Sequence, residues 1–190
     1  YQSLLCDLRF MLFTSLSFMC FGGLVIWLAT SPVILIHHLG LRPSHFGYLM
    51  MVTGLGTGLS GWANNRLIKS IPLENIILIG AGLIGTAGVA FIVLYISLGL
   101  NTWSILAPGI AMILGSTLIF MNAFGLAFAQ VGTIAGYASA LYACIQLAGG
   151  VVFSAIVSHL NNSTPVVMGV FLTIIGLLAA IVCLVAKSHP

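Results

Sequence analysis

The charged residues of this chain are few, and they avoid its long apolar stretches. Five basic and two acidic residues are the only ones among 190 that carry a formal charge: Asp7, Arg9, Arg42, Arg66, Lys69, Glu74 and Lys187. Each lies at the end of an apolar stretch or between two of them. Because a charge at the centre of a lipid bilayer is costly, this distribution predicts a polytopic membrane protein. Its spans carry no acid or base of their own for proton or ion coupling.

The composition supports the same class of protein. Charged residues make up 4% of the chain and hydrophobic residues 61%, whereas about a quarter of the residues of a soluble domain are charged. A soluble fold has no interior large enough to bury this much apolar surface. The net charge of +3 is small and dispersed, so we expect no nucleic-acid partner.

Six apolar stretches are long enough to cross a bilayer, which takes about 20 residues of helix. They cover approximately residues 10–36, 46–67, 76–98, 103–128, 135–160 and 166–186. The short connectors between them are rich in Gly, Pro, Asn and Ser, which end helices and form tight turns. The sequence therefore predicts an all-α membrane protein with six transmembrane helices.

The basic residues also predict the orientation of these spans. Six spans place both ends of the chain on one side of the membrane. That side collects four of the basic residues, and the other side has only Arg42; the four are Arg9, Arg66, Lys69 and Lys187. Short cytoplasmic loops are enriched in Lys and Arg, so we expect both termini in the cytoplasm.

Small residues recur at a spacing of four in the second span. Gly54 and Gly58 form one such pair, and Gly56 and Ser60 form another. This pattern lets the backbones of two membrane helices approach closely. It predicts a compact helix bundle, and such smooth surfaces are also compatible with helices that slide against each other.

A few polar or amphipathic side chains lie deep within the predicted spans. Asn122 is near the middle of the fourth span, and Gln146 is near the middle of the fifth, one turn after Tyr142. Trp27 lies deep in the first span, where its indole N–H needs a partner. An amide in hydrocarbon must form hydrogen bonds, so these side chains either clamp helices together or line a polar cavity.

Features near the end of the first span have two interpretations each. Pro32 bends a spanning helix, either at its terminus or at a gating point. His37 and His38 are adjacent, so on a helix they point about 100° apart and do not chelate one metal easily. We interpret them as interfacial residues and expect no metal site.

The sequence contains no constellation typical of an enzyme. It lacks a carboxylate pair within a span, an H-E-x-x-H motif and a P-loop. We therefore expect neither catalysis nor a cofactor. The chain begins with Tyr1 rather than Met, which predicts a fragment of a longer protein.

The first half of the chain contains short sequence motifs that resemble those of a known transporter family. Ser31-Pro32, followed by Pro43 to Leu49, resembles helices 7 and 8 of the bicyclomycin-resistance (Bcr/CflA) drug-efflux branch of the major facilitator superfamily. The segment from Asn64 to Ile68 resembles the loop that follows helix 8 in that branch.

The second half continues the resemblance in the same order. Residues 119–123 resemble a motif of helix 10, although Met121 replaces the usual proline before Asn122. Residues 136–141, followed by Gln146, resemble the start of helix 11. The likeness thus extends over nearly the whole chain.

This resemblance implies that residues 1–190 are the C-terminal six-helix half, helices 7 to 12, of a twelve-helix transporter in a bacterial inner membrane. Each half of such a protein contains two inverted three-helix repeats. The implied function is proton-coupled efflux of a small, partly apolar drug or metabolite by alternating access. The implied partners are lipid, the substrate, protons and the N-terminal half, which would hold the coupling acids.

The resemblance also assigns roles to individual residues. The cavity candidates are Trp27, Asn122, Tyr142 and Gln146. The cytoplasmic loop motif comprises Asn64, Asn65, Arg66 and Lys69, where the superfamily commonly has an aspartate beside its basic residues. A non-transporting membrane scaffold or assembly subunit is the alternative function.

Overall fold

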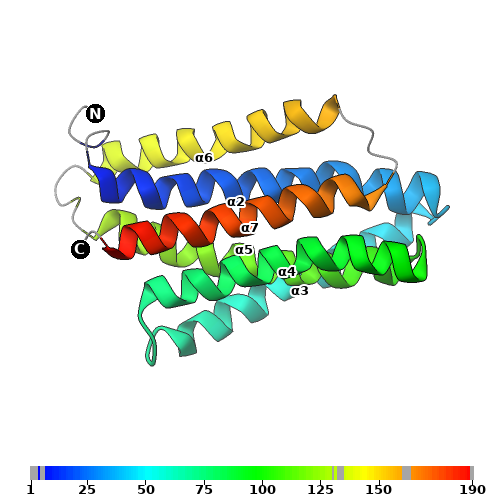
Figure 1. Ribbon diagram of the computed structural model, residues 1–190, viewed down its shortest axis with the longest axis horizontal. Coiled ribbons are helices and arrows are strands. Elements are labelled where there is room, and N and C mark those ends of the chain that lie inside the picture. Colours follow the sequence, from blue (N-terminus) through cyan, green and yellow to red (C-terminus); the bar gives the residue numbers. More distant parts are fainter. Residues whose placement is uncertain (1–3, 5–6, 130, 132–134, 160–163, 189–190) are drawn as a thin grey trace.

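A computed structural model of the chain describes residues 4, 7–129, 131, 135–159 and 164–188. Its long helices are α2 (Leu8–Pro32), α3 (Pro43–Leu67), α4 (Leu73–Leu98), α5 (Thr102–Phe128), α6 (Ala135–Ser158) and α7 (Pro165–Ser188) (Figure 1). The short π-helix η1 (Val33–His38) directly follows α2. The described residues include no strand. The prediction of an all-helical protein is confirmed.

The ends of these helices follow from local capping chemistry. The carboxylate of Asp7 accepts a hydrogen bond from the backbone N–H of Phe10 at 3.1 Å, which caps α2. Asn101 and Ser104 form a reciprocal capping box at the start of α5. α4 ends at Gly99, whose φ of +71° is a conformation that glycine adopts without strain. The turns that the sequence predicts are therefore built from the residues that favour them.

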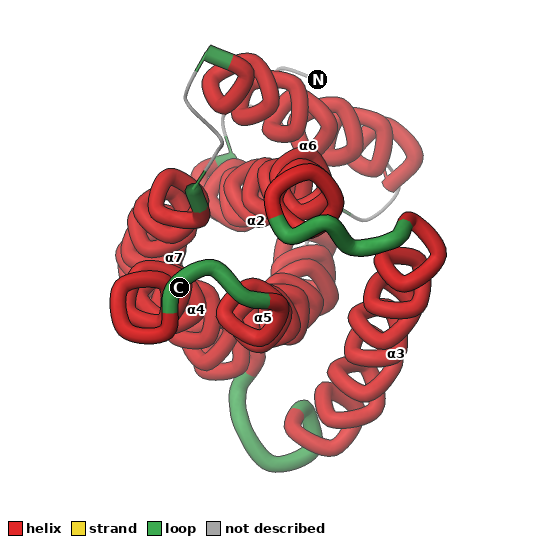
Figure 2. Tube along the Cα trace, turned by 90° about the vertical axis from the view of Figure 1, so that its right-hand side faces the viewer, coloured by secondary structure: helices red, strands yellow, loops and turns green. Residues whose placement is uncertain are grey.

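The helices form an antiparallel bundle with both ends of the chain at the same end of the bundle (Figure 1). We call this the termini end. Four helices form a closed ring of contacts, in which α2 and α4 each pack against both α5 and α7. α3 packs mainly on α5, and α6 mainly on α2, so both helices stand at the edge of the bundle (Figure 2).

Glycines allow the closest approaches within the ring. A Cβ atom added to Gly88 of α4 would lie 2.4 Å from the backbone nitrogen of Thr173 in α7. One added to Gly80 would lie 2.7 Å from the carbonyl oxygen of Gly115 in α5. Lipid provides no hydrophobic force between helices, so such close packing has to hold them together.

The small residues of α3 behave differently from those of α4. A Cβ atom at Gly54 or Gly58 would meet no atom within 4 Å. Their spacing predicted close packing, but within this chain α3 presents these two glycines at the surface. The reason is its place at the edge of the bundle, where one face has no neighbouring helix among the described residues. The second predicted pair, Gly56 and Ser60, is buried, and the Ser60 hydroxyl donates to a carbonyl oxygen of α5.

Five segments are long and apolar enough to cross a membrane: Leu8–His38, Leu73–Leu98, Thr102–Phe128, Ala135–Ser158 and Pro165–Lys187. The chain is therefore an integral membrane protein. The second predicted span, residues 46–67, forms the 25-residue helix α3, but that helix is not among these five. Its length suffices, and its glycine, serine and asparagine residues make it less apolar.

Candidate functional site

An open pocket of about 440 Å³ lies between α5 and α6. Five residues line it: Phe120, Met121, Phe124, Tyr142 and Gln146. The lining thus combines aromatic rings, a thioether and one amide, and none of the five carries a charge. Two other hollows, one of about 730 Å³ between α2 and α6 and one of about 320 Å³ between α4 and α7, are lined mainly by aliphatic and small residues.

Tyr142 is the most firmly held member of this pocket. Its hydroxyl forms a short hydrogen bond with the Ser17 hydroxyl of α2, and both residues are buried. Its ring meets Phe124 edge to face, with centroids 5.3 Å apart and planes at 88°. Phe128 makes a similar contact at 5.8 Å. Edge-to-face contacts and a hydroxyl bond together fix the orientation of the Tyr142 ring.

Two phenylalanines of α5, Phe120 and Phe124, line the pocket opposite Tyr142, and Phe128 extends their row beyond it. Phe120, Phe124 and Phe128 follow each other by one turn of α5 and so share a face. Phe124 and Phe128 stack with centroids 4.3 Å apart. This i, i+4, i+8 pattern is visible in the sequence and predicts an aromatic face, although the candidates chosen from the sequence did not include it.

Gln146 lies one turn after Tyr142 on α6 and is half-buried. It is the only amide among the pocket's five lining residues. An amide offers both donors and acceptors, so it can fix the orientation of a ligand that the aromatic rings hold by apolar contact. The structure thus brings two of the four cavity candidates, Tyr142 and Gln146, into one pocket.

Asn122, the third candidate, faces another helix. Its Nδ2 donates one hydrogen bond to Oδ1 of Asn64 at 2.6 Å and another to the carbonyl oxygen of Leu118 at 2.7 Å. The side chain is 2% exposed, and Asn122 is not among the pocket-lining residues. Of the two interpretations of an amide in a span, this geometry matches a clamp between α5 and α3.

Trp27, the fourth candidate, lies within the core of the ring. The ring of Trp27 covers Gly109 of α5 so closely that an added Cβ atom would lie 2.3 Å from it. Its centroid is 6.0 Å from that of Phe91 in α4. Trp27 is fully buried and does not line the pocket between α5 and α6. In this structure Trp27 is therefore a core residue of the ring, and its role in a substrate cavity stays a prediction.

Pro32 is the last residue of α2, and the chain does not stop there. The helical path continues as the π-helix η1 to His38. Proline lacks the N–H that an α-helix needs at this position, and a wider helical turn is one way to continue without it. His37 and His38 are exposed in the last turn of η1.

The predicted loop motif lies mostly within a helix. Asn64, Asn65 and Arg66 belong to the last turn of α3, and only Lys69 lies in the turn beyond it. The expectation that all four form a loop is therefore corrected. The bond from Asn122 holds Asn64 inside the bundle, and the guanidinium of Arg66 lies 4.4 Å from the centre of the exposed Trp62 ring.

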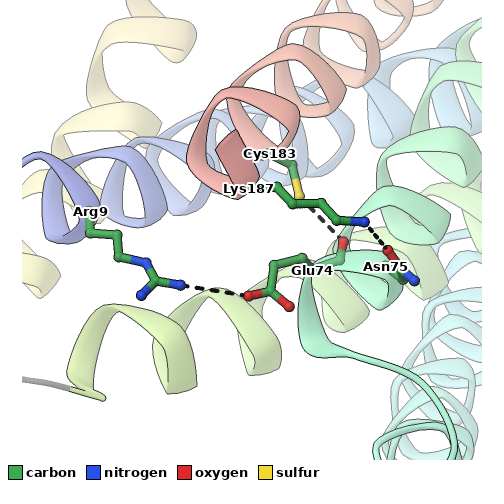
Figure 3. Close-up of polar contacts among 5 residues, drawn as sticks. All are labelled: Arg9, Glu74, Asn75, Cys183 and Lys187. Carbon is green, nitrogen blue, oxygen red and sulfur yellow. Dashed lines mark hydrogen bonds and ion pairs between the residues drawn. The ribbon is translucent and has the colours of Figure 1, made fainter. Parts of the chain in front are cut away.

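Polar contacts tie three helices together at the termini end (Figure 3). Arg9 of α2 lies 3.8 Å from the carboxylate of Glu74 in α4. Lys187 of α7 donates a hydrogen bond to Oδ1 of Asn75 at 3.1 Å, and the Cys183 thiol donates to the Glu74 carbonyl oxygen at 3.3 Å. These contacts hold the ends of α2, α4 and α7. A pocket of about 30 Å³ lies beside Asp7 and Arg9, and it is much smaller than that of Tyr142.

Comparisons with family models, with curated proteins and with solved structures gave no match. The helix arrangement and the pocket are therefore the observations from which a function is inferred.

Proposed function

We propose that this chain is the C-terminal six-helix half of a secondary active transporter of the major facilitator type, similar to its Bcr/CflA branch. The proposed activity is proton-coupled efflux of a small, partly apolar molecule by alternating access. The observation that carries the proposal is the pattern of contacts between helices, which is symmetric under the exchange of the first three long helices with the last three.

The exchange pairs α2 with α5, α3 with α6 and α4 with α7. It converts the contact between α2 and α6 into that between α5 and α3, and the contact between α4 and α5 into that between α7 and α2. The α2–α5 and α4–α7 contacts map onto themselves. Two inverted three-helix repeats would produce this pattern, and transporters bind substrate at the interface of such repeats.

The pocket supports the substrate class. Aromatic rings and a methionine favour flat or partly apolar molecules, and Gln146 offers hydrogen bonds for orientation. None of the five lining residues carries a charge at neutral pH. Proton coupling therefore requires groups outside this pocket, which we assign to the N-terminal half.

The distribution of basic residues supports an orientation for the proposed transporter. Arg9, Arg66, Lys69 and Lys187 belong to helix ends or turns at the termini end, whereas Arg42 precedes α3 at the opposite end. Short cytoplasmic loops are enriched in Lys and Arg, so the proposed orientation has both termini of this segment in the cytoplasm, and the proposed membrane is a bacterial inner membrane.

The test is transport by the full-length protein that contains this chain, reconstituted in liposomes with an imposed pH gradient. Ethidium, a flat organic cation, is the probe. We expect ethidium transport that depends on the pH gradient, and its rate should fall at least tenfold in Gln146→Ala. Cys144→Ala is the matched control, because Cys144 is an exposed residue of the same helix.

Two outcomes separate the parts of this proposal. Gradient-driven transport with normal activity in Gln146→Ala would reject the pocket as the binding site. If the wild-type protein moves neither ethidium nor other partly apolar compounds under any gradient, a membrane scaffold or assembly subunit becomes the better interpretation.

A further inference from the structure

Four buried polar atoms of α2 have no hydrogen-bond partner within the described part of the chain. One is Nε of Arg9 at the start of the helix, and the other three lie within five residues near its end: Nε1 of Trp27, Oγ1 of Thr30 and Oγ of Ser31. The three residues are 0%, 2% and 0% exposed. Buried polar groups in proteins are nearly always paired, so three such groups within five residues favour a hydrogen-bonding ligand at this place.

The three groups share one face of the helix. Residues at i, i+3 and i+4 lie above one another on an α-helix, and these residues are numbers 27, 30 and 31. The Trp27 ring fixes the direction of this face, because it lies on Gly109 of α5 and beside Phe91 of α4. The unpaired groups therefore belong to the interior of the ring, where lipid headgroups do not reach.

A second threonine on the same helix shows that burial alone does not leave a hydroxyl unpaired. Thr14 is also fully buried, and its hydroxyl donates to the carbonyl oxygen of Phe10 at 2.7 Å. Back-bonding of this kind is usual for threonine in a membrane helix. Thr30 has the same option in principle, but its hydroxyl is not bonded in this way in the structure.

The backbone changes its winding immediately after these groups. Pro32 has no N–H, and residues 33–38 form the π-helix η1. π-helical turns are rare and occur frequently at functional sites. Irregular backbone at membrane depth persists where protein or water satisfies the polar groups that it frees. This is an independent sign that the segment needs hydrogen-bonding partners beyond its own helix.

We propose that an ordered water molecule is bound inside the bundle at this place, bridging Trp27, Thr30 and Ser31. The indole N–H donates to the water oxygen, and the two hydroxyls accept from it or donate to it. A buried water typically makes about three hydrogen bonds, which is the number of unpaired groups present. The site is distinct from the pocket of Tyr142 and does not depend on the proposed transport activity.

The chemistry of the three groups favours a neutral ligand over an ion. An indole N–H only donates, so it repels a bound cation. No charged residue belongs to α2 after Arg9 or to η1, so an anion would lack a compensating charge. A molecule that both donates and accepts, and that is small enough for a packed helix interface, is water.

The experiment follows the indole N–H of Trp27 by NMR in the whole chain, labelled with ¹⁵N and held in lipid nanodiscs. The signal is assigned by its loss in Trp27→Phe. We expect a cross-peak between this proton and a water molecule, together with slow exchange in D₂O. Trp62 and Trp103, which are exposed, serve as internal comparisons for contact with the surroundings.

Three variants test the shared ligand. Thr30→Val and Ser31→Ala should each shift the Trp27 indole resonance and weaken its water cross-peak, and each should lower the melting temperature. Thr14→Val, the matched control, should leave the indole resonance in place. Unchanged signals in Thr30→Val, or a rise of its melting temperature above that of the wild type, would overturn the proposal, because an unpaired or back-bonded hydroxyl predicts those results.

Discussion

The side-chain amide of Asn122 in α5 donates a 2.6 Å hydrogen bond to the side-chain oxygen of Asn64 in α3. Both residues are buried, and they are 58 positions apart in the sequence. A second bond supports the same contact, since the Ser60 hydroxyl donates to the carbonyl oxygen of Leu114 at 3.0 Å. Hydrogen bonds between side chains and the neighbouring helix thus hold α3, the least apolar long helix, against the bundle.

The first prediction concerns the stability of this clamp. Asn122→Ala and Asn64→Ala should each lower the free energy of unfolding, because each removes the bond between α5 and α3. Asn122→Ala takes away the donor to Oδ1 of Asn64, whereas Asn64→Ala leaves the Asn122 amide with its bond to the Leu118 carbonyl. Their coupling energy in a double-mutant cycle should be about 0.6–1.7 kcal/mol, between the average and the maximum found for hydrogen bonds between membrane helices. Unfolding of the purified protein by SDS titration measures it.

Asn65→Ala is the control for the clamp, since Asn65 is exposed in the same turn of α3. It should change stability little. A coupling energy near zero between Asn64 and Asn122 would contradict the clamp, and a large effect of both on transport with none on stability would return Asn122 to the substrate cavity.

The second prediction compares two glycines of α4. Gly88→Ala should destabilise the protein by about 1–3 kcal/mol, as overpacking of a filled core does, because the new methyl group would lie 2.4 Å from a backbone nitrogen of α7. Gly82→Ala meets no atom within 4 Å, and it should be neutral or stabilise by up to about 1 kcal/mol through better helix propensity. Thermal melting in detergent separates the two, and equal effects would refute the α4–α7 packing.

The third prediction concerns the hydrogen bond between Ser17 and Tyr142. Tyr142→Phe should cost about 0.5–1.5 kcal/mol for the lost bond. Ser17→Ala should cost more, because it leaves the buried Tyr142 hydroxyl unpaired, whereas a lone serine hydroxyl can bond to its own helix. The same SDS titration gives both values, and the reverse order would show that the two hydroxyls do not depend on each other.

The fourth prediction concerns the ion pair between Arg9 and Glu74. The two side chains are 32% and 20% exposed and 3.8 Å apart, so Glu74→Gln should change the free energy of unfolding by about 0–1 kcal/mol. The backbone carbonyl that accepts from Cys183 is unaffected by this change. Melting curves at low and high salt check it, and a large, salt-independent loss would show that the pair has a structural role.

Some of the site was accessible from the sequence and some was not. The depth of Tyr142 and Gln146, and their shared face one turn apart, follow from helix periodicity, and the structure places both in one pocket. Ser17 was not foreseen, because serines in spans usually bond to their own helix, and only the packing of α6 on α2 brings the Tyr142 hydroxyl to it. The contact between Asn64 and Asn122 was not foreseen either, because the family resemblance assigned Asn64 to a loop motif, and the structure places it in the last turn of α3.

The sequence by itself determined that this protein belongs in a lipid bilayer and approximately where its helices begin and end. Seven charges confined to the ends of apolar stretches require a membrane, and Gly, Pro and Asn between the stretches require turns, since both effects are local. Only the tertiary structure decided which faces meet. In lipid, apolar side chains gain nothing by facing another helix rather than the bilayer, so hydrophobicity does not orient them. Close packing and hydrogen bonds orient the helices instead. The close contacts are those of Gly88 with Thr173 and of Trp27 with Gly109, and the hydrogen bond joins Asn122 to Asn64.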